Sequence, residues 1–136
     1  MQLRHIGATL TATLAVVAGS TLVNAAPAAA VGGCPSDKLC LYRSTEYRTM
    51  SFAAASTSAC FWLSDYGLTY PFNGISSYVN NLPVKATLWS GNAADPNSWY
   101  QRASIRSGGF SSDTFNGGDN NQWTTSDMVC TGSAKP

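Results

Sequence analysis

The stretch CPSDKLCLY, residues 34–42, decides the fold, because it joins a short cysteine loop to the start of an apolar strand. Its last three residues resemble Thr87-Leu88-Trp89, at an offset of 47 positions, and an offset of 48 sets residues 73–79 beside residues 121–127. These likenesses indicate an internal twofold repeat. Such a repeat predicts two Greek-key motifs of four strands that pack face to face, the first over about residues 34–82 and the second over about residues 84–130.

The rest of the sequence also indicates an all-β domain. Short apolar segments of strand character are separated by Gly, Pro, Asn and Asp, a pattern typical of an antiparallel sandwich or barrel. Helical signals are nearly absent. The expected strands cover residues 39–42, 49–52, 59–63, 76–79, 86–89, 99–105 and 127–130.

Four cysteines in a small exported chain indicate two disulfides, and three pairings are possible. Pro35 favours a turn between Cys34 and Cys40, so we expect that pair to close a local loop and Cys60 to pair with Cys130. In the chain-entropy model the local bridge contributes about 2 kcal/mol and the long-range bridge about 4 kcal/mol. A zinc site is the competing reading, and the absence of a C-x2-C pair disfavours it.

The N-terminal segment has the pattern of a secretory signal peptide. Arg4 and His5 precede an apolar run over residues 6–23, and small residues that fit signal peptidase follow. Cleavage after Ala25 or Ala30 would remove the leader within residues 1–30 and leave a domain over residues 31–136. We therefore expect a secreted protein with no membrane segment after cleavage.

The composition and the charge of the chain argue against two classes of function, nucleic-acid binding and catalysis. The chain of 136 residues is 44% hydrophobic and 11% charged with a net charge of +1, which gives no basic surface for nucleic acid. Its single histidine is His5, in the expected leader, so a Ser-His-Asp or Cys-His catalytic arrangement cannot be assembled afterwards. The seven carboxylates show no spacing that marks a catalytic pair. We expect a binding protein rather than an enzyme.

Two segments carry a resemblance to a known family. CPSDKLCLY (34–42), and LSDYG (63–67) with FNGISSYVNN (72–81), are similar to the secreted actinobacterial peptidase inhibitors typified by the Streptomyces metalloproteinase inhibitor. The resemblance implies a βγ-crystallin-like sandwich of two Greek keys. It also implies an inhibitor of an extracellular protease, with metalloproteases among the candidate targets, and we expect the protein to be a monomer.

Two positions depart from that family. Thr49 stands where the crystallin pattern has glycine, so we expect its folded hairpin to be built without a left-handed residue. The short disulfide loop associated with the reactive bond in the second half has no counterpart, because Cys130 is the only cysteine after Cys60.

An inhibitor of this kind needs a stiff exposed segment that enters a protease cleft as a substrate would. The first candidate is the loop expected at Ser90–Ser98, with Asn92, Asp95 and Asn97. The second is the longer, glycine-rich loop expected at Ser104–Gly118, with Arg106 and Phe110. The alternative for both is an ordinary variable loop.

The crystallin calcium motif offers a different function. Its first copy would use Asn73 and Ser76, and its second Asn121 and Thr124. These neutral oxygens predict weak calcium binding, and turns capped by Asn and Ser side chains are the alternative. No cofactor is required for inhibition. The rival hypothesis is a calcium- or glycan-binding module with an antimicrobial role, in which aromatic residues stack on sugar rings: Trp89, Trp99, Tyr100 and Trp123.

Overall fold

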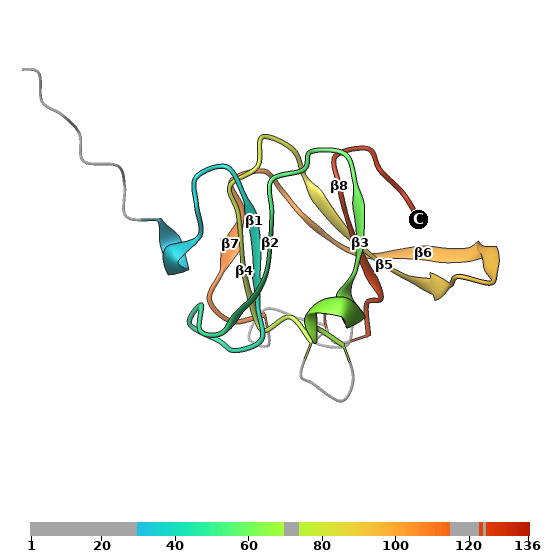
Figure 1. Ribbon diagram of the computed structural model, residues 1–136, viewed down its shortest axis with the longest axis horizontal. Helices are drawn as coiled ribbons and strands as arrows, with labels where there is room; N and C mark the ends of the chain where they lie inside the picture. The colour runs from blue at the N-terminus through green and yellow to red at the C-terminus, as the bar shows by residue number, and fades with distance from the viewer. Residues whose placement is uncertain (1–29, 70–73, 115–122, 124) are drawn as a thin grey trace, which may run out of the picture.

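The computed structural model describes residues 30–69, 74–114, 123 and 125–136. These residues form two four-stranded antiparallel sheets (Figure 1), which confirms the all-β sandwich. The first sheet has the order β2-β1-β4-β7 and contains β1 (Leu39–Tyr42), β2 (Met50–Ala54), β4 (Ser77–Asn80) and β7 (Phe110–Ser111). The second has the order β3-β8-β5-β6 and contains β3 (Cys60–Trp62), β5 (Ala86–Asn92), β6 (Asp95–Ile105) and β8 (Met128–Thr131).

Two short 3-10 helices complete the described elements, η1 (Val31–Gly33) and η2 (Leu63–Tyr66). In the ranges that the structure describes, no helix combines the length and hydrophobicity needed to cross a bilayer. The expected leader over residues 1–30 lies, except for Ala30, outside those ranges.

The two halves of the chain exchange their third strands, which the sequence does not predict. β3 belongs to the first half but pairs with β8 in the second sheet, and β7 belongs to the second half but pairs with β4 in the first. Apart from this exchange the two halves follow the same plan: β1 pairs with β2 and β4, as β5 pairs with β6 and β8. Neither half is therefore a closed unit, and each completes the sheet of the other.

The core lies between the two sheets. Leu41 of β1 and Leu88 of β5 are fully buried at its centre. The 47-residue offset relates these two leucines, so they occupy equivalent positions in the two halves. The strand pairs Leu88–Val129 and Phe61–Val129 continue one cross-strand row of apolar side chains over the inner face of the second sheet. These side chains share one face because alternate residues of a strand point to the same side of the sheet.

The second half of the repeat needs a correction. Leu41 pairs with Tyr78 and Leu88 pairs with Val129, so β4 and β8 are related by an offset of 51 positions (129 − 78) rather than 48. The backbone agrees, because the amide of Ser76 donates to the carbonyl of Tyr42 as the amide of Asp127 donates to that of Trp89. Because β1 and β5 are related by 47 positions and β4 and β8 by 51, the chain is four residues longer from β5 to β8 than from β1 to β4, and matching the motif letters misaligns the strands.

The hairpin between β1 and β2 contradicts the expectation about Thr49. Thr49 itself adopts the left-handed region at φ 59°, and Glu46 and Tyr47 do so at 57° and 55°. Thr49 supplies the conformation that glycine supplies in the crystallin pattern, because its carbonyl must reach the amide of Arg43 at 3.1 Å. A β-branched residue pays a conformational cost there.

Both expected disulfides are present. Cys34 is bonded to Cys40 and Cys60 to Cys130, and no described cysteine is free. The local bridge lies on the outer face of the first sheet in a small cluster with Tyr42 and Val79. The long-range bridge joins the facing residues of β3 and β8, so it fastens the exchanged strand to the second sheet.

Candidate functional site

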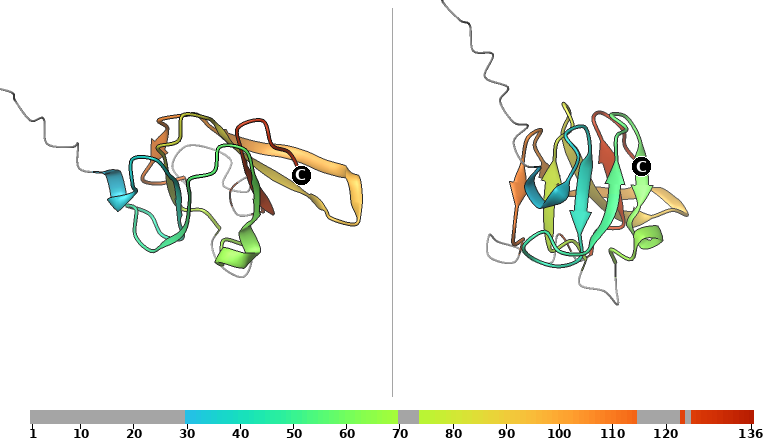
Figure 2. Two further views of the ribbon diagram at one scale, coloured as in Figure 1. Left: turned by 45° about the horizontal axis from the view of Figure 1, so that its top comes forward. Right: turned by 60° about the vertical axis from the view of Figure 1, so that its left-hand side comes forward.

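The hairpin of β5 and β6 projects beyond the sandwich (Figure 1), and Figure 2 shows the same projection from a second direction. Ser90–Ser98, expected to be a loop between two strands, is mostly strand. β5 runs on to Asn92 and β6 begins at Asp95, so only Ala93 and Ala94 form the turn. The side chains from Asn92 to Asn97 are exposed. The three candidates Asn92, Asp95 and Asn97 therefore lie together at the tip of a hairpin.

A bulge shapes this tip. Between the pairs Ser90–Tyr100 and Asn92–Asp95, β5 has Gly91 alone, whereas β6 has the four residues 96–99. Such an irregularity leaves backbone groups without ladder partners and bends the strand. The tip is consequently held by side-chain hydrogen bonds.

Ser98 is at the centre of these bonds. Its Oγ accepts from the amide of Asn92 at 2.7 Å, and it lies 2.7 Å from the carbonyl oxygen of Asp95 and 3.2 Å from that of Asn92, to which its single proton can be donated. Asn92 Oδ1 accepts from the amide of Ala94 at 2.9 Å, and Asp95 Oδ1 accepts from the amide of Asn97 at 3.0 Å. The exposed turn is thus ordered by its own side chains.

The base of the hairpin is fixed by an aromatic contact and a carboxylate. Trp99 lies against Gly91, where an added Cβ would come within 2.6 Å of the indole Cδ2. The Trp99 ring also contacts Trp62 of β3, with ring centroids 5.6 Å apart. Asp127 Oδ2 accepts from the amide of Gly91 at 3.1 Å. These contacts set the direction in which the hairpin leaves the sheet.

Sequence reasoning missed Ser98, Gly91 and Asp127. The run Asp95-Pro96-Asn97-Ser98 consists of turn-forming residues and does signal local side-chain hydrogen bonds. No sequence signal relates Gly91 to Trp99 or to Asp127, because those contacts depend on the register of β5 with β6 and on the path of the chain into β8.

The second candidate segment is tied to the body of the protein. Gly108 donates its amide to the carbonyl of Asn80 at 2.8 Å, and Asn80 donates its own amide to the carbonyl of Gly109 at 2.8 Å. The Asn80 side chain donates to the carbonyl of Arg106 at 3.1 Å. The part of the expected loop that the structure describes, up to Thr114, contains a tight turn at Gly108 and Gly109 followed by β7, and these two glycines are held by hydrogen bonds. The amides of Gly108 and Gly109 and the carbonyls of Arg106 and Gly109 are thus engaged within the protein, although the Phe110 side chain is 60% exposed.

Of the calcium candidates, only Ser76 lies in the described residues. Its hydroxyl donates to the carbonyl of Arg43 at 2.8 Å, and the residue is buried. Asn73, Asn121 and Thr124 lie outside the described residues. In the described part of the chain, no cluster of three or more His, Cys, Asp or Glu side chains is arranged to hold a metal. Calcium binding stays a prediction.

The aromatic candidates for glycan binding separate into two groups. Trp123 packs against the core and stacks on Tyr78 with centroids 5.1 Å apart, so it is a structural residue. Trp89 and Trp99 belong to the projecting hairpin and its base, and Tyr100 is 52% exposed. Of the four candidates only Tyr100 is exposed, whereas Trp89, Trp99 and Trp123 are half-buried.

A family model for peptidase inhibitor family I36 matches residues 27–103, more than half of the chain. The chain belongs to peptidase inhibitor family I36. The match confirms the resemblance that the cysteine loop and the first Greek-key segment indicate. No curated protein and no solved structure matches the chain.

The extent of the match bears on the two candidate segments. The I36 region ends at Ala103 and so includes the whole turn of the β5–β6 hairpin, whereas Arg106 and Phe110 lie beyond it. Membership makes the protein a peptidase inhibitor and gives it a protease as partner. Of the two segments, the hairpin is the one that the shared region contains.

Proposed function

We propose that this I36 protein is secreted and inhibits an extracellular protease by inserting the tip of the β5–β6 hairpin into the active-site cleft. The observation that carries the proposal is the projecting two-residue turn, whose residues are exposed and which is ordered by Asn92, Asp95 and Ser98. A segment that is ordered before it binds loses little conformational entropy on docking, and the smaller entropic cost gives a higher affinity.

The chemistry of the tip fits a substrate-like role. Ala93 and Ala94 are small and exposed, so they hinder the approach of a protease to the backbone less than large side chains would. The tip needs no acid, base or metal of its own, because the protease supplies the catalytic groups. After a slow cut, the hydrogen bonds of the hairpin would hold the new ends in place and favour religation or slow release.

The target class rests on the resemblance to metalloproteinase inhibitors. We propose a thermolysin-like metalloprotease as the first target to assay, with subtilisin-like and papain-like enzymes beside it. Binding of one monomer to one protease is the expected stoichiometry. If the purified protein at micromolar concentration left all three enzymes fully active, the proposal would be abandoned.

Two variants test which segment inhibits. Ser98→Ala removes the hydroxyl that orders the tip, and we expect the inhibition constant to rise about tenfold, as for the loss of about 1.4 kcal/mol of preorganisation. Ser107→Ala is the matched control, because its hydroxyl donates to the carbonyl of Leu82 at 2.6 Å beside the second candidate segment. A larger effect of Ser107→Ala than of Ser98→Ala would assign inhibition to the Arg106–Phe110 segment instead.

A further inference from the structure

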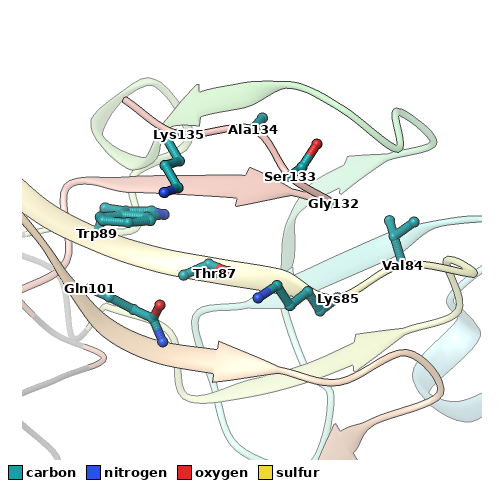
Figure 3. A pocket seen from close by; sticks show the side chains of 9 residues that line it. All are labelled: Val84, Lys85, Thr87, Trp89, Gln101, Gly132, Ser133, Ala134 and Lys135. Atoms are coloured by element: carbon teal, nitrogen blue, oxygen red, sulfur yellow. The ribbon is translucent and has the colours of Figure 1, made fainter.

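A pocket of about 590 Å³ lies on the outer face of the second sheet, at the base of the projecting hairpin (Figure 3). Thr87 and Trp89 of β5 and Gln101 of β6 form its floor, and the C-terminal segment after β8 forms a wall with Ser133 and Lys135. The tip residues Asn92–Ser98 are not part of its lining. The pocket is therefore separate from the segment proposed to inhibit.

The charge of the pocket is of one sign. Lys85 and Lys135 line it from different segments, and its lining contains no Asp or Glu. Figure 3 shows both side chains extending over the floor of the pocket. Neither ammonium group forms an ion pair within the described part of the chain. Two cations without an anion between them favour an anionic ligand.

Trp89 adds a donor that lacks an acceptor. Its Nε1 is buried, and among the described residues it has no hydrogen-bond partner. In Figure 3 the nitrogen-bearing edge of the indole is turned toward the middle of the pocket, with the end of the Lys135 side chain close by in that view. An indole N–H can only donate, as can an ammonium group. An oxygen that enters beside the flexible Lys135 side chain would accept from both.

The position in the first half that is equivalent to this pocket is filled by other residues of the chain. The 47-residue offset relates Trp89 to Tyr42 and Thr87 to Cys40. Tyr42 is fully buried, its hydroxyl donates to the carbonyl of Gly32 at 3.0 Å, and its ring packs against Tyr47. The N-terminal segment thus fills in the first half the space that is an open pocket in the second.

We propose that this pocket binds an acidic sugar, a hexuronate unit of a polysaccharide. The uronate carboxylate would lie between Lys85 and Lys135 and accept from Trp89 Nε1. The ring hydroxyls would exchange hydrogen bonds with Thr87, Gln101 and Ser133, which carry both donors and acceptors. A simple carboxylate would use only the cations, whereas a sugar ring uses the mixed polar floor as well, and the volume suits a ligand of one to a few rings.

The test is a calorimetric titration of the full chain with trigalacturonate, with its methyl ester as the neutral matched probe. We expect binding of the acid and about tenfold weaker binding of the ester. Lys85→Gln/Lys135→Gln should lower the affinity about tenfold, and Trp89→Phe should lower it about threefold. Lys38→Gln/Arg48→Gln, which removes two charges elsewhere, is the control and should bind like the unmodified protein.

Several outcomes would overturn the assignment. Absence of any heat of binding up to about 10 mM trigalacturonate would show that the pocket does not bind this ligand. Equal binding of the methyl ester would exclude the carboxylate, and triglutamate binding as tightly as trigalacturonate would exclude the sugar. An equal loss of affinity in the control variant would show that the effect comes from the net charge of the protein and not from this pocket. Protease inhibition by Lys85→Gln/Lys135→Gln should be unchanged, so this proposal and the inhibitory one fail independently.

Discussion

At the scale of single residues, the fold tolerates a threonine where the geometry favours glycine. Thr49 is exposed and holds φ at 59°, a region in which a β-branched side chain is strained. Its neighbours Glu46 and Tyr47 share the left-handed conformation. The backbone of the β1–β2 hairpin is therefore slightly strained at Thr49, and glycine at this position would relieve the strain.

Thr49→Gly should stabilise the protein by about 1 kcal/mol, because the relief of left-handed strain exceeds the extra chain entropy of glycine in the unfolded state. Denaturant unfolding monitored by circular dichroism would measure it. Thr57→Gly is the control, since Thr57 is also exposed but has no positive φ, and it should leave the protein unchanged or less stable. Destabilisation by both variants to the same extent would show that Thr49 is unstrained.

Three tyrosines couple the stability of the domain to alkaline pH. Burial raises the pKa of Tyr42, Tyr47 and Tyr78 above the ordinary value of 10.0. Below pH 10 the phenols are neutral in both states and their contribution to stability is complete. As the pH rises above 10, the unfolded chain loses its phenolic protons more readily than the folded one, so stability falls.

Tyr42→Phe should reduce this alkaline loss and lower stability at neutral pH by about 1 kcal/mol, through the lost hydrogen bond to Gly32. Melting temperatures between pH 7 and about pH 11 would check both effects. Tyr100→Phe, at an exposed ring, is the control. If the stability of Tyr42→Phe falls at alkaline pH as much as that of the unmodified protein, Tyr42 does not contribute to this fall.

At the scale of elements, the β5–β6 hairpin depends on a close approach between Gly91 and Trp99. Gly91→Ala would place a Cβ within 2.6 Å of the indole. We expect a loss of about 1–3 kcal/mol of stability and weaker inhibition, because Trp99 must move away from Trp62 and change the direction of the hairpin.

A double-mutant cycle separates this contact from other effects of the alanine. In a Trp99→Ala background the same Gly91→Ala change should cost clearly less, since the indole atoms that it would strike are gone and only the close approach to the Cα of residue 99 at 2.9 Å remains. Thermal unfolding of the four proteins gives the coupling energy. Equal costs of Gly91→Ala in both backgrounds would mean that the glycine is needed for its backbone alone.

The elements also show what sequence can and cannot predict. Seven strands follow from their short apolar segments and from the turn-formers between them, because those signals are local. β7 lies in a segment that the sequence predicts to be a loop. It has only two residues and exists through its pairing with Tyr78 and Val79, so it leaves no local signal. The candidate residues Asn92, Asp95 and Asn97 were found by composition, but the hairpin that gathers them depends on Ser98 and on strand register.

At the scale of the whole molecule, exchanged strands and disulfides hold the two halves together. The pairing of cysteines could be predicted from spacing. The exchange of β3 and β7 was not predicted, because it depends on the long-range pairing of β3 with β8 and of β7 with β4. The bridge between Cys60 and Cys130 spans 70 positions and joins the exchanged β3 to β8, and the bridge between Cys34 and Cys40 spans only 6.

Replacing Cys60 and Cys130 by alanine should therefore cost about 4 kcal/mol, and replacing Cys34 and Cys40 about 2 kcal/mol, in the chain-entropy model. Urea unfolding of the two double variants would give the comparison, and each serves as the control for the other. A larger loss from the local pair would contradict the view that the long-range bridge secures the strand exchange.

Hydrogen exchange of the protein in complex with its inhibited protease tests the central claim most directly. If the hairpin tip occupies the active-site cleft, the amides of residues 92–95, 97 and 98 should exchange more slowly in the complex than in the free protein, while those of residues 106–110 keep their free rates. Protection of residues 106–110 with an unchanged tip would contradict the account and place the inhibitory surface on the other segment.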